Sequence, residues 1–439
     1  MLLGAPLIAN NLANAGMSFA DTVMAGQLGA RELAGLAIGV SYYNLCFFFG
    51  LGALMALAPC VAHAYGAQDD TSVTRFLRQS LWLVIGLSVV SVTALCQADR
   101  ALHAFGITPD IFPTAVGYCQ AISWGMPALF AFLALRFTSE GLGITRPIMY
   151  IAFFGLGANV FGNWVFMYGH FGMPQLGAVG CAVASAISMW LMLLAMLVYM
   201  RGHRRFRAYR FFDRIDCPDA SILRQLVGVG FPIGGSVLSE GGLFVVAALL
   251  MGSMGATVMG AHQIALNYAA LMFMIPLAMN SATTIHVGHT LGRGATIHAR
   301  SAGWTGIAMC GAVMSVSALF IVIFNEQIAA MYTGDSDVRE LAGTLLLMAA
   351  IFQLSDGLQV GAAGALRGFK DTAIPLAITL FAYWCVGFPI AYIFGVHQAR
   401  GPVYVWLGLI LGLTVAAALL NLRYRTVSLR TRLAVTLSD

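Results

Sequence analysis

Three acidic residues lie deep inside long apolar stretches, where a charged side chain is costly. Glu240 stands in the run Leu238-Ser239-Glu240-Gly241-Gly242-Leu243-Phe244, and Asp21 and Asp356 occupy comparable places in two other apolar stretches. At the centre of a bilayer a charged residue costs about 2.5–3.5 kcal/mol on insertion scales, so such residues usually mark ion or proton pathways. We therefore expect a cation or proton site at these acids. The alternative is a neutral carboxyl that only hydrogen bonds between helices.

Side-chain amides accompany the acids at helical spacing. Asn14 precedes Asp21 by seven residues and Gln359 follows Asp356 by three, so each pair shares a helix face. Pairs four residues apart are Asn159 with Asn163 and Gln263 with Asn267. Oxygen ligands suit hard cations, and a carboxyl in a low-dielectric setting can exchange a proton near neutral pH. Each half of the chain therefore offers a coupling cluster, although interhelical hydrogen bonding would also explain the amides.

The composition predicts that these residues are carried by membrane-spanning helices. The chain of 439 residues is 59% hydrophobic and 9% charged, against about 25% charged residues in soluble domains. Apolar runs long enough to cross about 30 Å of hydrocarbon recur along it. We expect an all-α integral membrane protein with twelve spans near 2–27, 35–64, 76–97, 113–136, 148–168, 177–200, 224–252, 257–287, 302–325, 341–366, 373–396 and 402–422.

Charge and repetition predict the arrangement of these spans. Most of the 23 Lys and Arg residues follow even-numbered spans, so the positive-inside rule places both termini in the cytoplasm. Pro6 and Pro232, Gly26 and Gly252, Gly29 and Gly255, and Gly66 and Gly292 match at an offset of 226 residues. We expect two pseudo-symmetric six-helix lobes, 1–200 and 224–439, joined by a basic cytoplasmic linker, 201–223, which includes Arg210 and Arg214. Transporters place their sites within or between such parallel repeats.

Several function classes are disfavoured by what the sequence lacks. The one lysine, Lys370, is not part of a phosphate-binding loop, and no hydrolase or protease motif is present. The eight cysteines form no C-x-x-C pair, so we expect neither a zinc site nor a disulfide framework. We expect no enzyme activity, no cofactor and no nucleic-acid partner. Arg136 and Glu140 are spaced for a structural ion pair, and His262, His286 and His289 are interpreted as core or interface histidines.

Five stretches together resemble the multidrug and toxic compound extrusion (MATE) family, in its NorM-type bacterial branch. They are FADTVMAG (19–26), GHFGMP continuing to Cys181 (169–181), LFVVAALL (243–250), GAHQIALN (260–267) and LRGFKDT (366–372). The likeness runs through nearly the whole chain and in order.

The resemblance implies a V-shaped pair of lobes and export of cationic, amphipathic drugs and dyes in exchange for Na⁺ or H⁺. It implies a bacterial inner-membrane protein that functions as a monomer in the lipid bilayer. Glu240 and Asp356 match the carboxylates of the second-lobe cation site, where Na⁺ could bind. Asp21, Asn159 and Asn163 match the polar cluster of the first lobe.

The chain departs from the family pattern at three places. Phe352 stands where relatives often carry Tyr, which removes a hydroxyl near Asp356. Gly241 and Gly242 replace a bulkier pair after Glu240, and His286 occupies a position often held by Arg. A lipid-linked glycan flippase of the same superfamily is the alternative function, but it needs a basic cavity, and the intramembrane charges here are mainly acidic.

Overall fold

The structure, a computed structural model, describes residues 4–104, 109–207, 209, 211, 213–214 and 216–436. Arg210 of the expected basic linker lies outside these residues. Within the described part of the chain all regular structure is helical. The chain divides into two compact units, Met1–Gly234 and Gly235–Asp439. The expected lobe boundaries at 200 and 224 stay a prediction.

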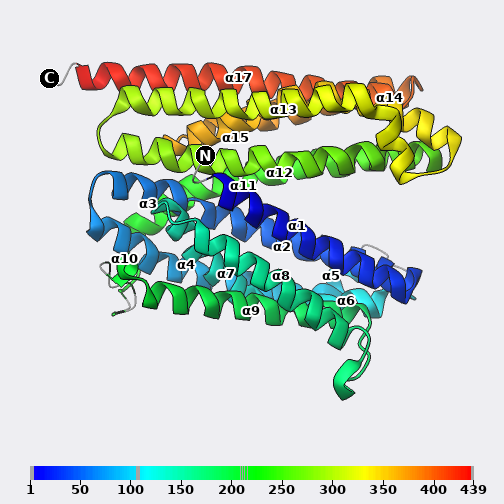
Figure 1. The fold of residues 1–439 in the computed structure, drawn as a ribbon, viewed down its shortest axis with the longest axis horizontal. Coiled ribbons are helices and arrows are strands. Elements are labelled where there is room, and N and C mark those ends of the chain that lie inside the picture. The colour runs from blue at the N-terminus through cyan, green and yellow to red at the C-terminus, as the bar shows by residue number, and fades with distance from the viewer. Residues whose placement is uncertain are drawn as a thin grey trace. The chain divides into compact units, whose positions relative to one another are not determined.

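Unit 1 consists of helices in the order expected for the first six spans, with two of those spans broken (Figure 1). The prolines Pro113, Pro127 and Pro147 stand in the first turns of their helices, where the missing N–H group breaks no helical bond. The elements are α1 (Gly4–Leu28), α2 (Ala30–Met55), α3 (Leu57–Gly66), α4 (Asp70–Cys96), α5 (Ala98–Ala104), α6 (Phe112–Ser123), α7 (Met126–Gly141), α8 (Arg146–Phe166), η1 (His170–Gly172), α9 (Ala178–Gly202) and α10 (Arg204–Arg207).

Unit 2 repeats this pattern with longer helices. Helix α11 (Ala220–Ser253) begins in unit 1 and ends in unit 2. The span predicted at 373–396 is helical throughout but contains two π-helical segments, η2 and η3. The remaining elements are α12 (Ala256–Gly292), α13 (Thr296–Tyr332), α14 (Ser336–Gly368), α15 (Ala373–Leu380), η2 (Phe381–Gly387), α16 (Phe388–Ile390), η3 (Ala391–His397) and α17 (Pro402–Thr436).

The helices agree with the predicted membrane spans. Among the described residues ten helices are long and apolar enough to cross a membrane, and eleven if α6 and α7, bent by 50° at their junction, form one span. Helix α1 corresponds to the predicted span 2–27 but is not among these. Its asparagines, Asp21 and Gln27 interrupt its apolar residues.

The backbone conformation supports the internal repeat at the matched glycines that suggested it. Gly29 precedes α2 with φ 121° and ψ 166°, and Gly255 precedes α12 with φ 122° and ψ 167°. This conformation is open essentially only to glycine. Gly66 and Gly292, the last residues of α3 and α12, are each followed by a right-handed cap residue. The two units therefore share both their glycine positions and the local geometry that requires glycine.

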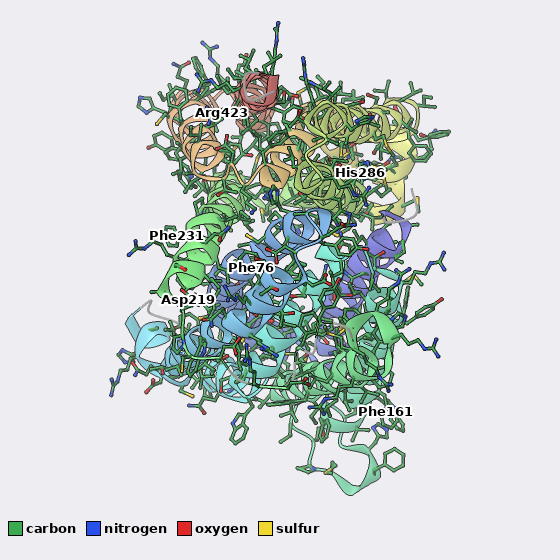
Figure 2. The ribbon with its side chains drawn as sticks, turned by 90° about the vertical axis from the view of Figure 1, so that its left-hand side faces the viewer. Phe76, Phe161, Asp219, Phe231, His286 and Arg423 are labelled. Carbon is green, nitrogen blue, oxygen red and sulfur yellow. The ribbon has the colours of Figure 1, made fainter. Side chains whose placement is uncertain are left out.

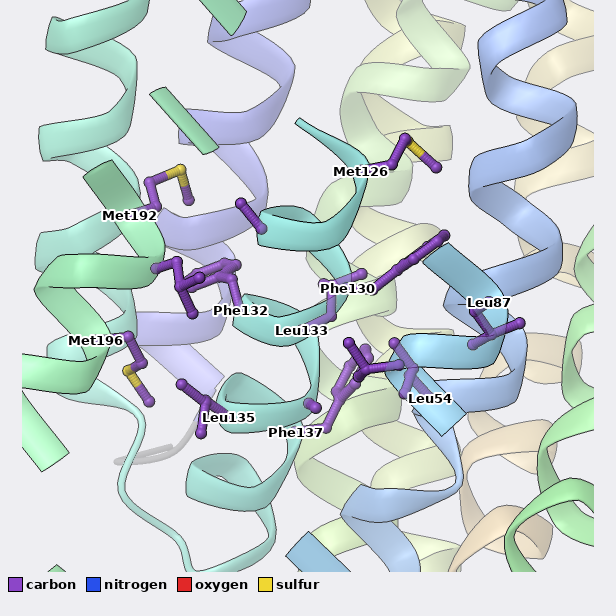
Figure 3. Packing of buried hydrophobic residues seen from close by; sticks show 14 of the residues in the cluster. Leu54, Leu87, Met126, Phe130, Phe132, Leu133, Leu135, Phe137, Met192 and Met196 are labelled. Atoms are coloured by element: carbon purple, nitrogen blue, oxygen red, sulfur yellow. The ribbon is translucent and has the colours of Figure 1, made fainter. Parts of the chain in front are cut away.

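The core of unit 1 is centred on α7, as Figure 3 shows. Phe130, Phe132 and Phe137 from this helix are at most 5% exposed. They lie among aliphatic and methionine side chains from α2, α4 and α9, including Leu54 and Met192. Helix α8 packs against both α9 and α1. This packing holds α1 and α8, which carry the acids and amides of this unit, at a fixed spacing.

The first part of α11 packs closely on α2 within unit 1. A Cβ atom added to Gly230 would meet the backbone of Ala53, and one added to Gly52 would meet the backbone of Gly234. Such small-residue contacts let helix backbones approach in membranes. In unit 2 the central helix is α14, which packs against α12, α13 and α17.

The segment before α11 is tied to α4. Gln79 donates to the carbonyl of Cys217 over 2.7 Å and accepts from the amide of Asp219 over 2.8 Å. Arg78 pairs with Asp216 at 3.3 Å. Figure 2 labels Phe76 on α4, Asp219 just before α11 and Phe231 within α11. These bonds fix the end of the expected linker against the start of α4.

Candidate functional site

In unit 1 the structure brings together Asp21, Asn159 and Asn163. The Asn163 side-chain amide donates to the Asp21 carboxylate over 2.6 Å and to the Asn159 side-chain oxygen over 3.3 Å. Asn159 in turn donates to the Ser185 hydroxyl over 3.0 Å. Both asparagines are at most 1% exposed, while Asp21 is half-buried. The three predicted residues thus form one connected cluster across α1 and α8, supported by α9.

The neighbourhood of Asp21 is more polar than the sequence indicates. The Cys181 thiol on α9 lies close to the Asp21 carboxylate. The side-chain oxygen of Asn163 is buried and has no hydrogen-bond partner among the described residues. Burying an acceptor without a partner costs about 1–3 kcal/mol, so this oxygen is a free ligand position beside a carboxylate. Asn14, two helical turns before Asp21, is half-buried.

In unit 2 Asp356 and Gln359 lie on one buried face of α14. Each is 3% exposed. One carboxylate oxygen of Asp356 and the side-chain oxygen of Gln359 have no partner among the described residues. Phe352, one turn before Asp356, packs its ring edge-on against Phe244 and Trp406 with centroids 5.9 and 5.8 Å apart. This face of α14 therefore carries the unpaired oxygens of Asp356 and Gln359 close to a cluster of aromatic side chains.

Glu240 of α11 lies near this face and near an arginine. It interacts electrostatically with Asp356 and with Arg367, which stands in the last turn of α14. Arg367 donates to the side-chain oxygen of Asn280 on α12 over 3.3 Å, and Asn280 donates to the Val360 carbonyl over 2.6 Å. No hydrogen bond to Glu240 is found in the part of the chain that the structure describes. These contacts bring two acids and one arginine near one another inside unit 2.

Two residues of the predicted set lie apart from the acid pair. Gln263 and Asn267 have exposed side chains on α12, and the Asn267 oxygen accepts from the Tyr332 hydroxyl over 3.0 Å. The buried polar side chain of this stretch is instead His262, which is 0% exposed and packs against Trp406 with ring centroids 5.7 Å apart.

Other predictions about polar residues can be checked directly. Arg136 and Glu140 form the expected ion pair at 2.7 Å, with Glu140 buried. The interpretation of His262 as a core histidine is confirmed, whereas His286, labelled in Figure 2, has an exposed side chain on α12. No group of three metal-binding side chains occurs among the described residues.

Two residues near the acids were missed in the sequence. Arg367 directly follows the predicted span 341–366, so the sequence suggests that it lies in a loop. In the structure α14 continues to Gly368, and Arg367 is part of this helix. Tyr383 stands alone in an apolar run, so no spacing singles it out. It is fully buried, and it interacts electrostatically with both Glu240 and Asp356. Only the packing of η2 against α11 could have revealed it.

The donor sets in both units fit a hard monovalent cation or a proton. Each consists of carboxylate, amide and hydroxyl oxygens, the ligands that hard cations prefer, and each includes buried oxygens without partners. Native proteins rarely leave buried polar atoms unpaired. Such atoms are therefore free to accept an ion, a water molecule or a proton.

Comparisons with known proteins identify the family of the chain. The MatE family model matches residues 6–165 and 232–393, one match in each half of the chain. The chain is 41% identical to the "Probable multidrug resistance protein NorM" of Xanthomonas campestris pv. campestris over 98% of this chain and 94% of that protein. It is equally identical to the protein of that name from Xanthomonas axonopodis pv. citri, over 99% of this chain and 95% of that protein.

Solved structures show the same fold. One structure, "Crystal structure of MATE in the straight conformation", matches with a TM-score of 0.90 at 21% identity and covers 98% of this chain and 95% of that chain. At this identity the match establishes the fold alone. The family model and the relatives carry the further conclusion: the chain belongs to the MATE family of membrane transporters, in its NorM-type branch.

Proposed function

We propose that the protein is a multidrug efflux antiporter that exports cationic, amphipathic compounds in exchange for Na⁺ or H⁺. The observation that carries the proposal is the buried, unpaired carboxylate oxygen of Asp356 beside Glu240 in unit 2. The Asp21 cluster in unit 1 supports it with a half-buried carboxylate and a buried, unpaired amide oxygen of Asn163. The names of the NorM relatives support the class of substrate.

The chemistry of coupling follows from the cost of burying charge. Two carboxylates in one low-dielectric site repel each other unless a cation or a proton lies between them. Binding a cation at Glu240 and Asp356 therefore stabilises whichever conformation brings the two acids together. A conformational equilibrium shifts only by the difference in ligand affinity between its two states. A cationic drug that needs the same negative charge would compete with the ion, which gives reciprocal coupling.

Arg367 lowers the net negative charge of the site formed by Glu240 and Asp356. Its guanidinium is held by Asn280 and already offsets part of the charge of Glu240. The acid pair plus Arg367 therefore has one net negative charge when both acids are ionised, which suits one monovalent cation. A glycan flippase would need an excess of cations to hold a pyrophosphate, and a lone arginine paired with acids does not supply it.

Replacing single acids in proteoliposomes tests the proposal. We expect Glu240→Gln and Asp356→Asn each to abolish ethidium efflux driven by an imposed cation gradient, and Asp21→Asn to reduce it strongly. Glu326→Gln is the matched control, because Glu326 is an exposed acid on α13. The proposal fails if all three variants transport like the wild type.

We also propose that the protein spans the bacterial inner membrane, as a monomer, with both termini in the cytoplasm. The excess of Arg after even-numbered spans supports this orientation. Cys96, at the end of α4, and Cys217, before α11, both have exposed side chains and belong to opposite sides in this topology. In intact cells a membrane-impermeant maleimide should label a variant that keeps only Cys96 and spare one that keeps only Cys217. The reverse pattern would invert the topology.

A further inference from the structure

The π-helical segment η2 is an unusual element in unit 2. It covers Phe381–Gly387 within a span that begins at Ala373 and ends at His397. π-Helical turns are rare and frequently occur at functional sites, because the wider turn redirects side chains. Within η2, Ala382 and Tyr383 are each 0% exposed, whereas the side chain of Phe381 is 51% exposed. The segment therefore buries a tyrosine inside the unit.

Segment η2 lies against α11 on both sides of Glu240. The Trp384 indole N–H donates to the Ser239 hydroxyl over 3.0 Å. The Cζ2 atom of Trp384 lies 3.2 Å from the position that a Cβ on Gly242 would take. Ser239 directly precedes Glu240 and Gly242 follows it by two residues. A side chain at 242 would press against the indole, so this glycine permits the close approach of η2 to the acid.

The hydroxyl group of Tyr383 is buried without a partner. It has no hydrogen bond among the described residues, and the buried side-chain oxygen of Gln359 also lacks a partner. Glu240 and Asp356 are both near enough to interact electrostatically with it. Burying a hydroxyl group without a hydrogen bond is unfavourable. An occupant of the acid site that uses the hydroxyl oxygen would remove this penalty.

The aromatic residue one turn before Asp356 offers no such oxygen. Phe352 is one turn before Asp356 on α14, and its ring is enclosed by Phe244 and Trp406. Phe352 therefore supplies no oxygen to the acids from its position on α14. Tyr383 directly precedes Trp384, which contacts α11 on both sides of Glu240, and Tyr383 carries a buried hydroxyl group without a partner.

We infer that Tyr383, with Gln359, completes the coupling-cation site of Glu240 and Asp356 by supplying a phenolic oxygen from η2. Toward Na⁺ the hydroxyl oxygen is a neutral ligand, and toward a protonated acid pair it donates to the remaining carboxylate. The inference rests on the proposed function, since it concerns the same site. It assigns to this site a residue that neither its motif nor its spacing indicates.

The test is the concentration of driving cation that gives half-maximal ethidium efflux from proteoliposomes. The driving cation is whichever of Na⁺ and H⁺ drives efflux by the wild type. Losing one hydrogen bond or ligand contact of typical strength should raise this concentration about fivefold in Tyr383→Phe. The dissociation constant of ethidium, measured by fluorescence without a gradient, should stay unchanged, because only the cation site has lost a group. A simple packing defect would change both quantities.

Two further variants complete the design. Tyr424→Phe is the matched control: Tyr424 is 0% exposed in the same unit, and its hydroxyl donates to the Arg300 carbonyl over 2.9 Å. It should leave the half-maximal concentration unchanged. Phe352→Tyr in the Tyr383→Phe background should restore the wild-type value, because it returns a hydroxyl to the site from α14. If Tyr383→Phe fails to fold, Phe352→Tyr alone should lower the half-maximal concentration, since it adds an oxygen.

The inference and the proposed function can fail separately. If Glu240→Gln abolishes coupling while Tyr383→Phe behaves like the wild type, the acid site stands and the role of Tyr383 is wrong. The same conclusion follows if Tyr383→Phe and Tyr424→Phe shift the cation dependence equally, or if Phe352→Tyr restores nothing. If neither gradient drives efflux by the wild type, the proposed function itself is wrong and the inference falls with it.

Discussion

The side-chain amide of Asn163 donates to the Asp21 carboxylate over 2.6 Å and so joins α8 to α1. Asn163 is 0% exposed, and its own oxygen remains unpaired. The bond holds the carboxylate in one orientation while leaving an acceptor free beside it. Ser185 lies one step further away and orients only Asn159. We therefore expect substitution of Asn163 to reduce efflux more than substitution of Ser185.

Asn163→Leu should reduce cation-driven efflux about tenfold, because a hydrogen bond to a charged group is worth about 1.5–3 kcal/mol and a factor of ten is 1.36 kcal/mol. Ser185→Ala should reduce it by much less, since it leaves the Asp21 contact in place. Initial efflux rates in proteoliposomes at matched protein density provide the measurement. Equal effects of the two substitutions would mean that the Asp21–Asn163 bond has no special role.

Gly29→Ala and Gly255→Ala should destabilise the protein by similar amounts, about 1–3 kcal/mol each, because both glycines adopt a conformation that a Cβ atom disfavours. Gly26→Ala and Gly252→Ala are the matched controls, since both lie in regular helix with no atom closer than 4.0 Å to an added Cβ. Thermal unfolding in detergent compares the four variants. A cost at only one of the two positions would contradict the structural repeat.

Asp69 should make stability depend on pH at the start of α4. Hydrogen bonds from the Ser72 side chain and amide lower the pKa of Asp69, which caps this helix. A lowered folded-state pKa stabilises the protein above the unfolded value and loses that effect as the pH falls through the folded value. Asp69→Asn keeps a capping group but cannot titrate.

Thermal unfolding of the wild type and Asp69→Asn between neutral pH and about pH 3 tests this. The difference between the two proteins should be largest near neutral pH and should shrink below about pH 4 as the wild-type carboxyl becomes protonated. A difference that stays constant over the whole range would show that the charge of Asp69 contributes nothing.

Arg423 and Asp371 form an ion pair at 2.7 Å between α17, where Figure 2 labels Arg423, and the turn after α14. The side chains are 26% and 15% exposed, so water and salt screen the pair only in part. A double-mutant cycle with Arg423→Gln and Asp371→Asn should give a coupling free energy of about 0.2–1 kcal/mol, smaller at high salt. A coupling free energy of zero at low salt would show that the ion pair does not contribute to stability.

Much of the fold could be predicted from periodicity and charge. Most predicted spans agree with the helices within seven residues at each end, whereas α17 continues to Thr436, well beyond the predicted end at 422. Gly29 and Gly255, which suggested the repeat, have the same backbone conformation. The break between α6 and α7 was not predicted, because Trp124 and Gly125 interrupt the helix without changing the apolar character of the segment. The π-helical segments were missed for the same reason. Hydropathy measures how apolar a helix is and carries no information on its local winding.

The candidate site was predicted where its residues repeat on one helix face and missed where it depends on packing between helices. Asp21, Asn159 and Asn163 were singled out by type and spacing, and the structure joins them. Gln263 and Asn267 have the same spacing, but this spacing does not say which face is buried. Tyr383 has no polar neighbour in sequence, and only the fit of Trp384 over Gly242 places it near Glu240.

The most direct test of the central claim is ethidium efflux from proteoliposomes that contain the purified protein, with an inward Na⁺ gradient and an inward proton gradient imposed separately. A cation-coupled antiporter should respond to at least one gradient, and that response should vanish in Glu240→Gln and Asp356→Asn while ethidium still binds. Response to Na⁺ alone would favour direct ligation of the ion by the oxygens around Asp356. Response to the proton gradient alone would favour protonation of the buried carboxyls. Efflux that neither gradient stimulates, or that both variants still carry out, would contradict cation-coupled antiport.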